Sequence, residues 1–324
     1  MPTSESLIPQ DLRISGDKIA CSARHAVEPR THSLMIFQVT VPQKSAYRGR
    51  LAPSPTGYLH IGHAHTFLKA AQRASEHAGT LVLRNEDLDP QRSRPEFARA
   101  MLEDLRWLGI RWSEGPDIGG PLGPYSQSER RSLYVEAWRQ LRDRDLIYPC
   151  GCSRKDLAQA ASAPNDLDDE PVYPGHCRGR TDGRDFQEPK GINWRFRVPD
   201  RQAVRFVDFH FGQQSYVAGA DFGDVLVWRR DDVPAYQLAV VVDDAAMQIS
   251  EVVRGADLLK STARQMLLQR ALQLPAPSYF HCELLRDDSG QRLAKRHDSL
   301  SLRQLRESGM SPEAVLDLAF RQQS

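Results

Sequence analysis

The 324-residue sequence has no long hydrophobic run and almost no net charge. No apolar stretch approaches the roughly 18 residues that span a bilayer, and the first 30 residues lack the apolar core of a secretory signal. We therefore expect a cytoplasmic protein without a membrane partner. A formal net charge of +1 argues against a protein that is basic over its whole surface, although a local basic face for nucleic acid stays open.

Cysteine is also scarce. The five cysteines are an odd number, and Cys150 and Cys152 are separated by a single residue. This pattern favours metal ligands in a reducing compartment over a disulfide framework. Cys21 and Cys282 are then spare thiols.

What the sequence does contain is typical of a globular protein, with 40% apolar and 26% charged residues. Residues 1–46 show no sustained period apart from a strand-like stretch at 34–41. We expect them to form a mostly loose extension that carries no chemistry.

From residue 47 the pattern alternates between strands and helices. Short strands are expected near residue 48 and at 80–84, and helices at 62–77, 96–108 and 130–144. Such alternation predicts an α/β fold with a doubly wound parallel sheet, whose first half would be residues 47–148.

The next segment breaks this alternation. Residues 149–223 are rich in Cys, Pro, Gly and charged clusters, which predicts a small inserted subdomain. The second half of the sheet domain is expected at 224–275, with a helix or strand at 236–242, a strand at 251–254 and a helix at 262–272. Residues 276–324 would add a loop and one short helical stub, with no further domain.

The most specific segment runs from Arg50 to His63, between a predicted strand and a predicted helix. The amino end of a helix favours an anion, so this is a phosphate site in principle. Gly62 would let a ligand approach the backbone, while His60 and His63 can donate hydrogen bonds to phosphate oxygens. Taken alone, the same residues also fit a proline-rich turn with two surface histidines.

The whole string from Arg50 to His63 resembles the first signature of the glutamyl-tRNA synthetases, a class I synthetase family. Five later stretches match in the same order, at residues 83–89, 127–130, 236–244, 253–257 and 292–296. The resemblance covers about residues 48–300. It implies a Rossmann-like catalytic domain that activates an amino acid with ATP and Mg²⁺.

The resemblance also implies a glutamate pocket. It falls on six residues, Arg50, Ala52, Ser54, Glu86, Tyr236 and Arg254. These residue types fit the ligand, because a guanidinium group binds a carboxylate well and an acid can neutralise the α-ammonium group. Outside this motif, each arginine would be read as part of a surface ion pair.

The implied ATP site consists of His60, Gly62, His63, Gly255, Asp257, Arg292 and Lys295, of which His60, His63 and Lys295 are the expected catalytic residues. The second signature, at 292–296, departs from the family pattern because Arg292 replaces the usual lysine and Ala294 the usual serine. Lys295 keeps a charge that can stabilise the pyrophosphate leaving group. The change puts the rate in doubt more than the reaction, and on its own the segment would read as a solvated basic loop.

A cysteine cluster is the third candidate site. Cys150, Cys152 and Cys177 would supply three thiolates to a structural Zn²⁺ that staples the small insertion. The spacing from Tyr173 to Cys177 resembles that of short synthetase relatives, which implies Tyr173 as the fourth ligand. His176 is the alternative on general grounds. Three unrelated buried thiols are the other interpretation.

The sequence ends soon after Lys295, so we expect no anticodon-binding domain of the kind found in full-length glutamyl-tRNA synthetases. Val240, Leu258 and the cysteine spacing fit a shorter group, which resembles the glutamyl-queuosine tRNA(Asp) synthetases. The implied substrates are L-glutamate and the anticodon stem-loop of tRNA(Asp) carrying queuosine, bound by a monomer.

Four basic residues of this chain are candidates for contacts with tRNA phosphates, namely Arg178, Arg180, Arg184 and Arg229. Taken alone, each is better explained as a solvated surface charge. Two other functions stay open: a truncated glutamyl-tRNA synthetase that charges the tRNA acceptor end, and a catalytically silent paralogue that binds glutamate or RNA.

Overall fold

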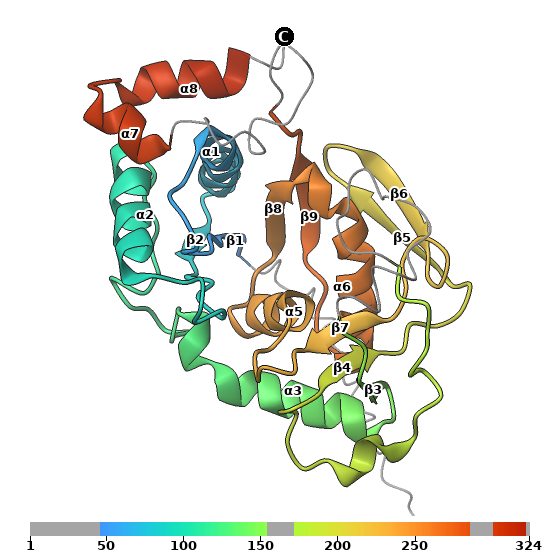
Figure 1. Cartoon of the computed structure of the whole chain (residues 1–324). Helices are drawn as coiled ribbons and strands as arrows, with labels where there is room; N and C mark the ends of the chain where they lie inside the picture. Colours follow the sequence, from blue (N-terminus) through green and yellow to red (C-terminus); the bar gives the residue numbers. More distant parts are fainter. Residues whose placement is uncertain (1–45, 154–171, 286–300, 322–324) are drawn as a thin grey trace, which may run out of the picture. The chain divides into compact units, whose positions relative to one another are not determined.

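The computed structural model describes residues 46–153, 172–285 and 301–321 (Figure 1). The helices are α1 (Ile61–Glu76), α2 (Pro95–Trp107), α3 (Arg131–Asp143), α5 (Tyr236–Ala246), α6 (Leu259–Leu272), α7 (Leu302–Glu307) and α8 (Pro312–Arg321). The strands are β1 (Arg48–Leu51), β2 (Thr80–Leu83), β3 (Ile147–Cys150), β4 (Asn193–Phe196), β5 (Ala203–Asp208), β6 (Gly212–Val217), β7 (Val225–Trp228), β8 (Glu251–Gly255) and β9 (Ser278–Cys282).

The strands form three hydrogen-bonded sheets of mixed type. Strands β1 and β2 are a parallel pair, and β3, β4 and β7 form an antiparallel sheet. The third sheet has the order β6-β5-β9-β8, in which β8 and β9 are parallel. The predicted alternation of strands and helices is therefore confirmed for the part of the chain around β1, α1 and β2.

The two parallel pairs lie side by side (Figure 1). The Ser250 N–H donates to the Arg48 carbonyl at 2.9 Å, and the Arg50 side chain reaches the Val253 carbonyl at 2.8 Å. From the first contact to the second, the residue numbers increase in both strands. Strands β1 and β8 therefore run in the same direction. Their carboxyl ends therefore open at one edge, where ligands bind in α/β folds.

Helix α1 packs on this parallel arrangement through an apolar face. Its residues Ala64, Phe67, Ala70 and Ala74 recur at helical spacing and are buried in one core with Leu83 of β2. The predicted helix at 62–77 is confirmed by this helix. Its first turn is thereby fixed beside the carboxyl ends of β1 and β8.

A second core lies under α3, α5 and α6 and is centred on tryptophans. Trp138 of α3 and Trp194 of β4 meet edge to face with ring centroids 4.9 Å apart, and Trp228 of β7 belongs to the same core. Strand β4 belongs to the predicted insertion and β7 to the predicted second half of the domain, which begins at residue 224. The two strands are nevertheless paired in one sheet. The proposed domain boundaries stay predictions.

The carboxyl-terminal part differs from the single helical stub that the sequence predicts. It contains two helices, α7 and α8, separated at Gly309, whose φ of 83° lies in the left-handed region that favours glycine. Leu302 and Val315 are buried in the same core as α1. Ser301 starts α7 because its hydroxyl accepts the Gln304 N–H at 3.2 Å.

None of the helices in the described ranges is long and apolar enough to cross a membrane.

Candidate active site

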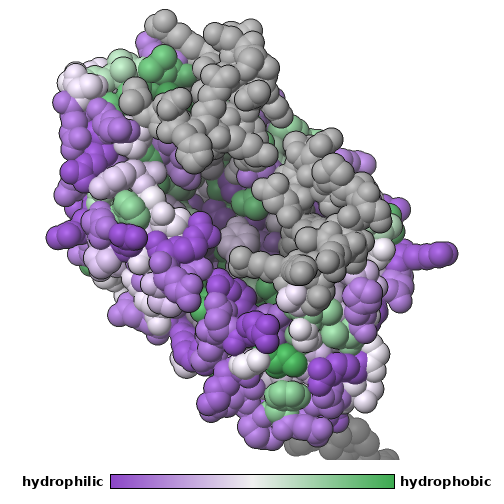
Figure 2. Space-filling model, in the orientation of Figure 1, coloured by the Kyte–Doolittle hydropathy of each residue, from purple (hydrophilic) through white to green (hydrophobic). Residues whose placement is uncertain are grey.

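A cavity of about 510 Å³ opens where β1, β2 and β8 end. It is lined by every described residue of the predicted glutamate and ATP sites, namely Arg50, Ala52, Ser54, His60, Gly62, His63, Glu86, Tyr236, Arg254, Gly255 and Asp257. Arg292 and Lys295 lie outside the described residues. Figure 2 shows the surface hollowed near the centre of the view, with hydrophilic residues prominent around the hollow.

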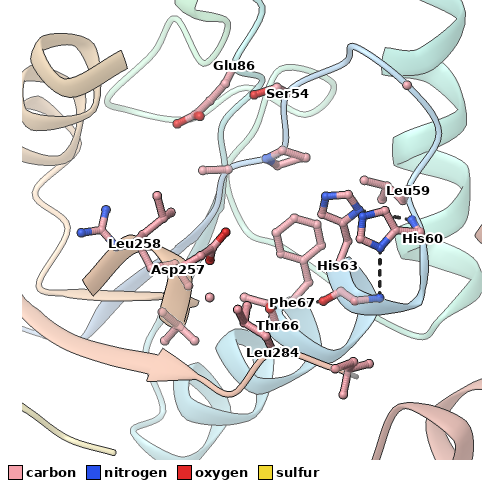
Figure 3. Close-up of a pocket in the computed structure, with 18 of the residues that line it drawn as sticks. Ser54, Leu59, His60, His63, Thr66, Phe67, Glu86, Asp257, Leu258 and Leu284 are labelled. Carbon is pink, nitrogen blue, oxygen red and sulfur yellow. Dashed lines mark hydrogen bonds between the residues drawn. The ribbon is translucent and has the colours of Figure 1, made fainter. Parts of the chain in front are cut away.

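Both histidines of the first signature cap helix α1. The Nδ1 atom of His60 accepts the Gly62 N–H at 3.1 Å, and the Nδ1 atom of His63 accepts the His60 N–H at 3.2 Å. The two rings lie next to each other in the cavity, with centroids 3.8 Å apart (Figure 3). Since each Nδ1 is an acceptor, the ring hydrogen of each neutral imidazole is on Nε2.

His63 stays neutral at physiological pH. Burial, helped by the neighbouring His60, lowers the pKa of His63 to about 3. A neutral imidazole still donates through Nε2, so the ring can bind an anion by hydrogen bonding without carrying a charge. The capping arrangement thus provides donors at the start of a helix, where the dipole also favours anions.

Two glycines make room for polar side chains of the cavity. A Cβ on Gly62 would lie 3.1 Å from the His60 ring, and a Cβ on Gly255 would lie 2.6 Å from Oδ1 of Asp257. The second distance is too short for a real contact. Gly255 therefore allows the Asp257 carboxylate to lie against the end of β8.

Arg50 enters the cavity from β1 and is almost fully buried. Its Nη1 donates to the Val253 carbonyl at 2.8 Å, and its Nε lies 3.5 Å from Oδ1 of Asp244. That Nε has no hydrogen-bond partner among the described residues. The guanidinium is thus held in place while part of its donor capacity is unused.

Glu86 is fixed by an arginine that the sequence analysis did not single out. Arg84 is completely buried and donates to Oε1 of Glu86 at 2.9 Å and to Oδ1 of Asp244 at 2.6 Å. Burial raises the pKa of Glu86, and the attraction of Arg84 offsets only part of this effect. Burial also disfavours ionised Asp244, but Arg84 and Arg50 outweigh it and hold that pKa below its ordinary value.

Arg254 differs from the other two arginines because its side-chain partners in the described part of the chain are all uncharged. Its Nε donates to His281 at 3.1 Å, its Nη1 to Gln265 at 2.8 Å and its Nη2 to Thr262 at 2.7 Å. Arg50 and Arg254 thus bring two buried guanidiniums to the cavity lining, and Glu86 brings a buried carboxylate. Asp257 and Glu283 line the same cavity, so the lining carries both signs of charge, which suits a ligand that also carries both.

The match at residues 127–130 has a structural explanation behind the cavity. Asp243 of α5 accepts hydrogen bonds from Arg130 at 2.6 Å, from Gln127 at 2.7 Å and from Tyr134 at 2.9 Å. Because all four side chains are buried, this network ties α3 to α5. It supports the helix that carries Asp244 without reaching the cavity itself.

The three predicted cysteine ligands come together away from this cavity. The Sγ atoms of Cys150, Cys152 and Cys177 all lie within 4.8 Å of one another, and those of Cys152 and Cys177 are 3.7 Å apart. Two thiolates at about 2.3 Å from a tetrahedral Zn²⁺ are separated by about 3.8 Å. The sulfur spacing therefore fits a shared metal ion.

Tyr173 rather than His176 is placed beside the thiols. Its hydroxyl lies 3.5 Å from the Sγ atom of Cys150 and 3.7 Å from that of Cys152, and it accepts the Cys177 N–H at 2.8 Å. His176 is not part of the group that offers metal ligands within the described ranges. Of the two candidates for the fourth ligand, Tyr173 is the one that fits this geometry.

The candidate phosphate contacts are largely used inside the protein. Arg178 pairs with Asp224 and Asp200, Arg180 with Asp182, Arg229 with Asp89 and Asp231, and Arg184 donates to the Asp143 carbonyl. Acidic partners compensate the charge of the first three. The structure therefore gives no support to the interpretation of these arginines as free cations for tRNA.

Comparison with known proteins identifies the family. Residues 46–322 match the model of the catalytic domain of class I tRNA synthetases (E and Q). A glutamyl-Q tRNA(Asp) synthetase of Symbiobacterium thermophilum is 49% identical over 83% of this chain and 84% of its own length. One from Nitratidesulfovibrio vulgaris is 48% identical over 81% of this chain and 82% of its own length.

Among solved structures, a glutamate tRNA ligase from Elizabethkingia meningosepticum, in complex with its amino acid, matches with a TM-score of 0.66 and 29% identity. The match covers 82% of this chain and 53% of that ligase, so the chain spans about half the length of this solved relative. Fold and sequence thus agree, and the chain belongs to the class I tRNA synthetases, among the relatives of the glutamyl-Q tRNA(Asp) synthetases.

Proposed function

We propose that the protein activates L-glutamate with MgATP and transfers the glutamyl group to the queuosine base at the wobble position of tRNA(Asp). The observation that carries the first half is the cavity, whose lining holds the buried guanidiniums of Arg50 and Arg254 and the buried carboxylate of Glu86. Free glutamate carries two carboxylates and one ammonium group at neutral pH, and these groups match two guanidiniums and one carboxylate.

The proposed roles in glutamate binding follow from the charges. Arg50 and Arg254 bind carboxylate oxygens, because both guanidiniums are buried and partly unengaged by acids. Glu86 takes the α-ammonium group, and Tyr236 adds a directional hydroxyl at the cavity wall. Ala52 and Ser54 line the same wall through the loop after β1.

ATP is proposed to bind at the start of α1. His60 and His63 donate through Nε2 to phosphate oxygens, and Gly62, Gly255 and Asp257 shape the neighbouring wall. Arg292 and Lys295 complete the site in this proposal and stabilise the pyrophosphate leaving group. The Mg²⁺ ion enters with the nucleotide.

The reaction then has two steps. An oxygen of the glutamate α-carboxylate attacks the α-phosphorus of ATP, the bond to the β-phosphate oxygen breaks, and pyrophosphate leaves with the bonding electrons. A hydroxyl of the queuosine ring next attacks the carbonyl carbon of the adenylate, loses its proton and releases AMP. Positioning and electrostatic stabilisation supply the catalysis, and no side chain acts as a nucleophile.

The choice of tRNA rests on the relatives. Two proteins 48–49% identical to this chain over more than four-fifths of their length are named glutamyl-Q tRNA(Asp) synthetases. The proposal further includes a doubly wound arrangement of the parallel strands, a cytoplasmic monomer, and the division at residues 46, 148, 223 and 275. It also includes a structural Zn²⁺ held by Cys150, Cys152, Tyr173 and Cys177, which would staple the insertion.

The test supplies the purified full chain with ATP, labelled glutamate and tRNA that contains or lacks queuosine. We expect glutamate-dependent exchange of pyrophosphate into ATP, and label on tRNA(Asp) only when queuosine is present. Periodate oxidation of the 3′-terminal ribose diol, in a tRNA whose queuosine diol is protected during the oxidation and freed afterwards, should leave labelling intact.

Each alternative predicts a different result. Labelling that needs the intact acceptor terminus and ignores queuosine would identify a truncated glutamyl-tRNA synthetase. Absence of pyrophosphate exchange at saturating glutamate would identify a silent paralogue. Either outcome overturns the transfer proposed above.

A further inference from the structure

Arg254 is oriented by side chains that lie behind the cavity wall. His281 of β9 is completely buried, and its Nε2 lies 3.1 Å from the Nε of Arg254. On the other side of the ring, Nδ1 lies 2.6 Å from Oδ2 of Asp208 at the end of β5. Asp208, His281 and Arg254 thus form a hydrogen-bonded series that leads from the protein interior to the cavity.

The positions of the hydrogens in this series follow from the one nitrogen that can only donate. The Nε of Arg254 always donates, so the Nε2 of His281 must accept. The ring hydrogen is then on Nδ1, and it donates to the Asp208 carboxylate. Burial lowers the pKa of His281, which agrees with a neutral ring. Asp208 is held by further donors, the backbone N–H groups of His210 and Phe211 at 3.0 and 2.9 Å.

We propose that Asp208 and His281 are positioning residues that select one hydrogen-bonding state of the imidazole and thereby aim the Arg254 guanidinium at the carboxylate of glutamate. This inference rests on the proposed function, because it deepens the role given to Arg254.

The chemistry explains why a histidine backed by an acid suits this place. A carboxylate in direct contact with Arg254 would compensate the charge that the ligand needs. A neutral imidazole fixes the position of the guanidinium edge without neutralising the positive charge of Arg254. The hydrogen bond to Asp208 keeps the ring hydrogen on Nδ1, and therefore off the nitrogen that faces Arg254. Gln265 and Thr262 hold the remaining edge in the same way, with uncharged oxygens.

Oγ1 of Thr262 also lies 3.2 Å from the Nε2 of His281. Two variants of similar size separate the contacts at Nε2 from the contact at Nδ1. Glutamine reaches about as far as the Nε2 of histidine, so His281→Gln keeps an acceptor for Arg254 and gives up the contact with Asp208. Asparagine reaches about as far as Nδ1, so His281→Asn keeps a donor for Asp208 and leaves the Nε of Arg254 without its acceptor. Both lose the ring, so each is the other's control for packing.

The readout is the KM for glutamate and the KM for ATP in pyrophosphate exchange. We expect His281→Asn to raise the KM for glutamate about 10- to 100-fold with little change in the KM for ATP, because the guanidinium is no longer aimed. His281→Gln should recover most of this loss. Equal effects of the two variants on both substrates, or a KM for glutamate unchanged by His281→Asn, would overturn the inference.

A second measurement does not depend on activity or on the stability of a variant. In wild-type protein labelled with ¹⁵N histidine, the resonances of His281 should show a hydrogen on Nδ1 and none on Nε2. In Asp208→Asn the amide hydrogens compete for Nδ1, so a shift toward the Nε2–H form is expected, as is a raised KM for glutamate. An Nε2–H form of His281 in the wild type would refute the inference. Wild-type protein that shows no pyrophosphate exchange would instead refute the proposed function, and the assigned tautomer of His281 would still stand.

Discussion

Glu86 shows how burial sets the working range of one residue in the cavity. Burial raises the pKa of its carboxyl group, while Arg84 donates two hydrogen bonds to the same oxygen and limits the rise. Only the ionised carboxylate can neutralise the α-ammonium group of glutamate. Substrate affinity should therefore depend on pH above the ordinary range of a glutamate side chain, about 4.3.

We accordingly expect the KM for glutamate to rise as pH falls, and to do so at a higher pH than an ordinary glutamate carboxyl would require, because a raised pKa makes Glu86 take up its proton early. The KM should be measured by pyrophosphate exchange from neutral pH downward. Glu86→Gln is the control, and its KM should be high and nearly flat with pH. A wild-type KM as independent of pH as that of Glu86→Gln would contradict the assigned role.

The ring of His63 accepts a hydrogen bond at Nδ1 for the helix start, and the proposed function gives it a second role as a donor at Nε2 for phosphate. His63→Asn can keep an acceptor near the His60 N–H but has no donor as far out as Nε2. We expect kcat for adenylate formation to fall by about 100-fold, the scale of losing one donor to developing charge. The free energy of unfolding should change by less than about 1 kcal/mol, the scale of a helix cap.

These two quantities are measured by single-turnover kinetics and by urea unfolding. A matched control is His77→Asn at the other end of α1, where the histidine lies outside the cavity lining. An unchanged kcat in His63→Asn would exclude the ring as a phosphate donor. A fall in kcat that follows the loss of stability would instead indicate a purely structural role.

At the scale of elements, the strand β3 and the turn at 173–177 are joined by thiols. Cys150 ends β3, and Cys152 and Cys177 lie beside it within 4.8 Å. The Tyr173 ring also packs under the buried guanidinium of Arg195, 4.0 Å from the ring centroid. The hydroxyl is thus held toward the sulfur atoms by packing as well as by its hydrogen bond.

Metal analysis of three variants tests which side chains hold a cation. Purified wild-type protein should contain about one equivalent of zinc, and Cys177→Ser should lose most of it and melt several degrees lower. His176→Ala should retain the metal, whereas Tyr173→Phe should retain less. Retention by Tyr173→Phe together with loss by His176→Ala would assign the fourth position to the histidine instead.

At the scale of the whole described fold, a buried acid couples the carboxyl-terminal helices to the catalytic part. Asp104 of α2 is fully buried and lies 3.4 Å from the Arg306 guanidinium of α7, and its oxygens have no hydrogen-bond partner in the described part of the chain. Burial raises the pKa of Asp104 to about 6. Ionised Asp104 therefore lowers the free energy of unfolding at neutral pH.

The sign of the pH effect follows from this shift. Between about pH 4, the unfolded value, and pH 6, the folded state binds more protons, so this group's contribution to stability falls as pH rises. We expect Asp104→Asn to abolish that dependence and to be more stable than wild type at pH 7 by about 1 kcal/mol. Urea unfolding at pH 5 and pH 7 measures both effects.

Glu103→Gln is the control, because Glu103 pairs with the same arginine from an exposed position. Its stability should stay within about 0.5 kcal/mol of wild type at both pH values. A destabilised Asp104→Asn at pH 7 would show that the attraction of Arg306 outweighs burial.

The sequence predicted the cavity better than its surroundings. Residues such as Arg50, Glu86 and Arg254 belong to compact motifs, and the structure brings them to one cavity. Arg84 and Asp244 lie in the matched stretches 83–89 and 236–244, but neither was predicted as a site residue. Their contact joins positions 160 residues apart, and no local sequence pattern encodes such a contact. The available signal was weak, two consecutive acids within the otherwise apolar segment of α5.

The carboxyl-terminal part was predicted less well for a different reason. Helices α7 and α8 are short, and the break between them is marked by Gly309 and by Pro312, the first residue of α8. A short amphipathic segment is not defined by its own periodicity, because packing against α1 and α2 supplies most of its stability. Likewise, the acids that pair with Arg178 and Arg229 are distant in sequence or too common to be identified beforehand.

The first turn of α1 has one more consequence for turnover. Since the backbone engages one nitrogen of each ring, the side of the imidazole that carries hydrogen is settled when the chain folds. In the proposed ATP site, the triphosphate would therefore meet both Nε2 hydrogens already in place, and no tautomer exchange would have to precede the chemical step. Rapid quench of the adenylation step should therefore show no slow activation phase before product appears.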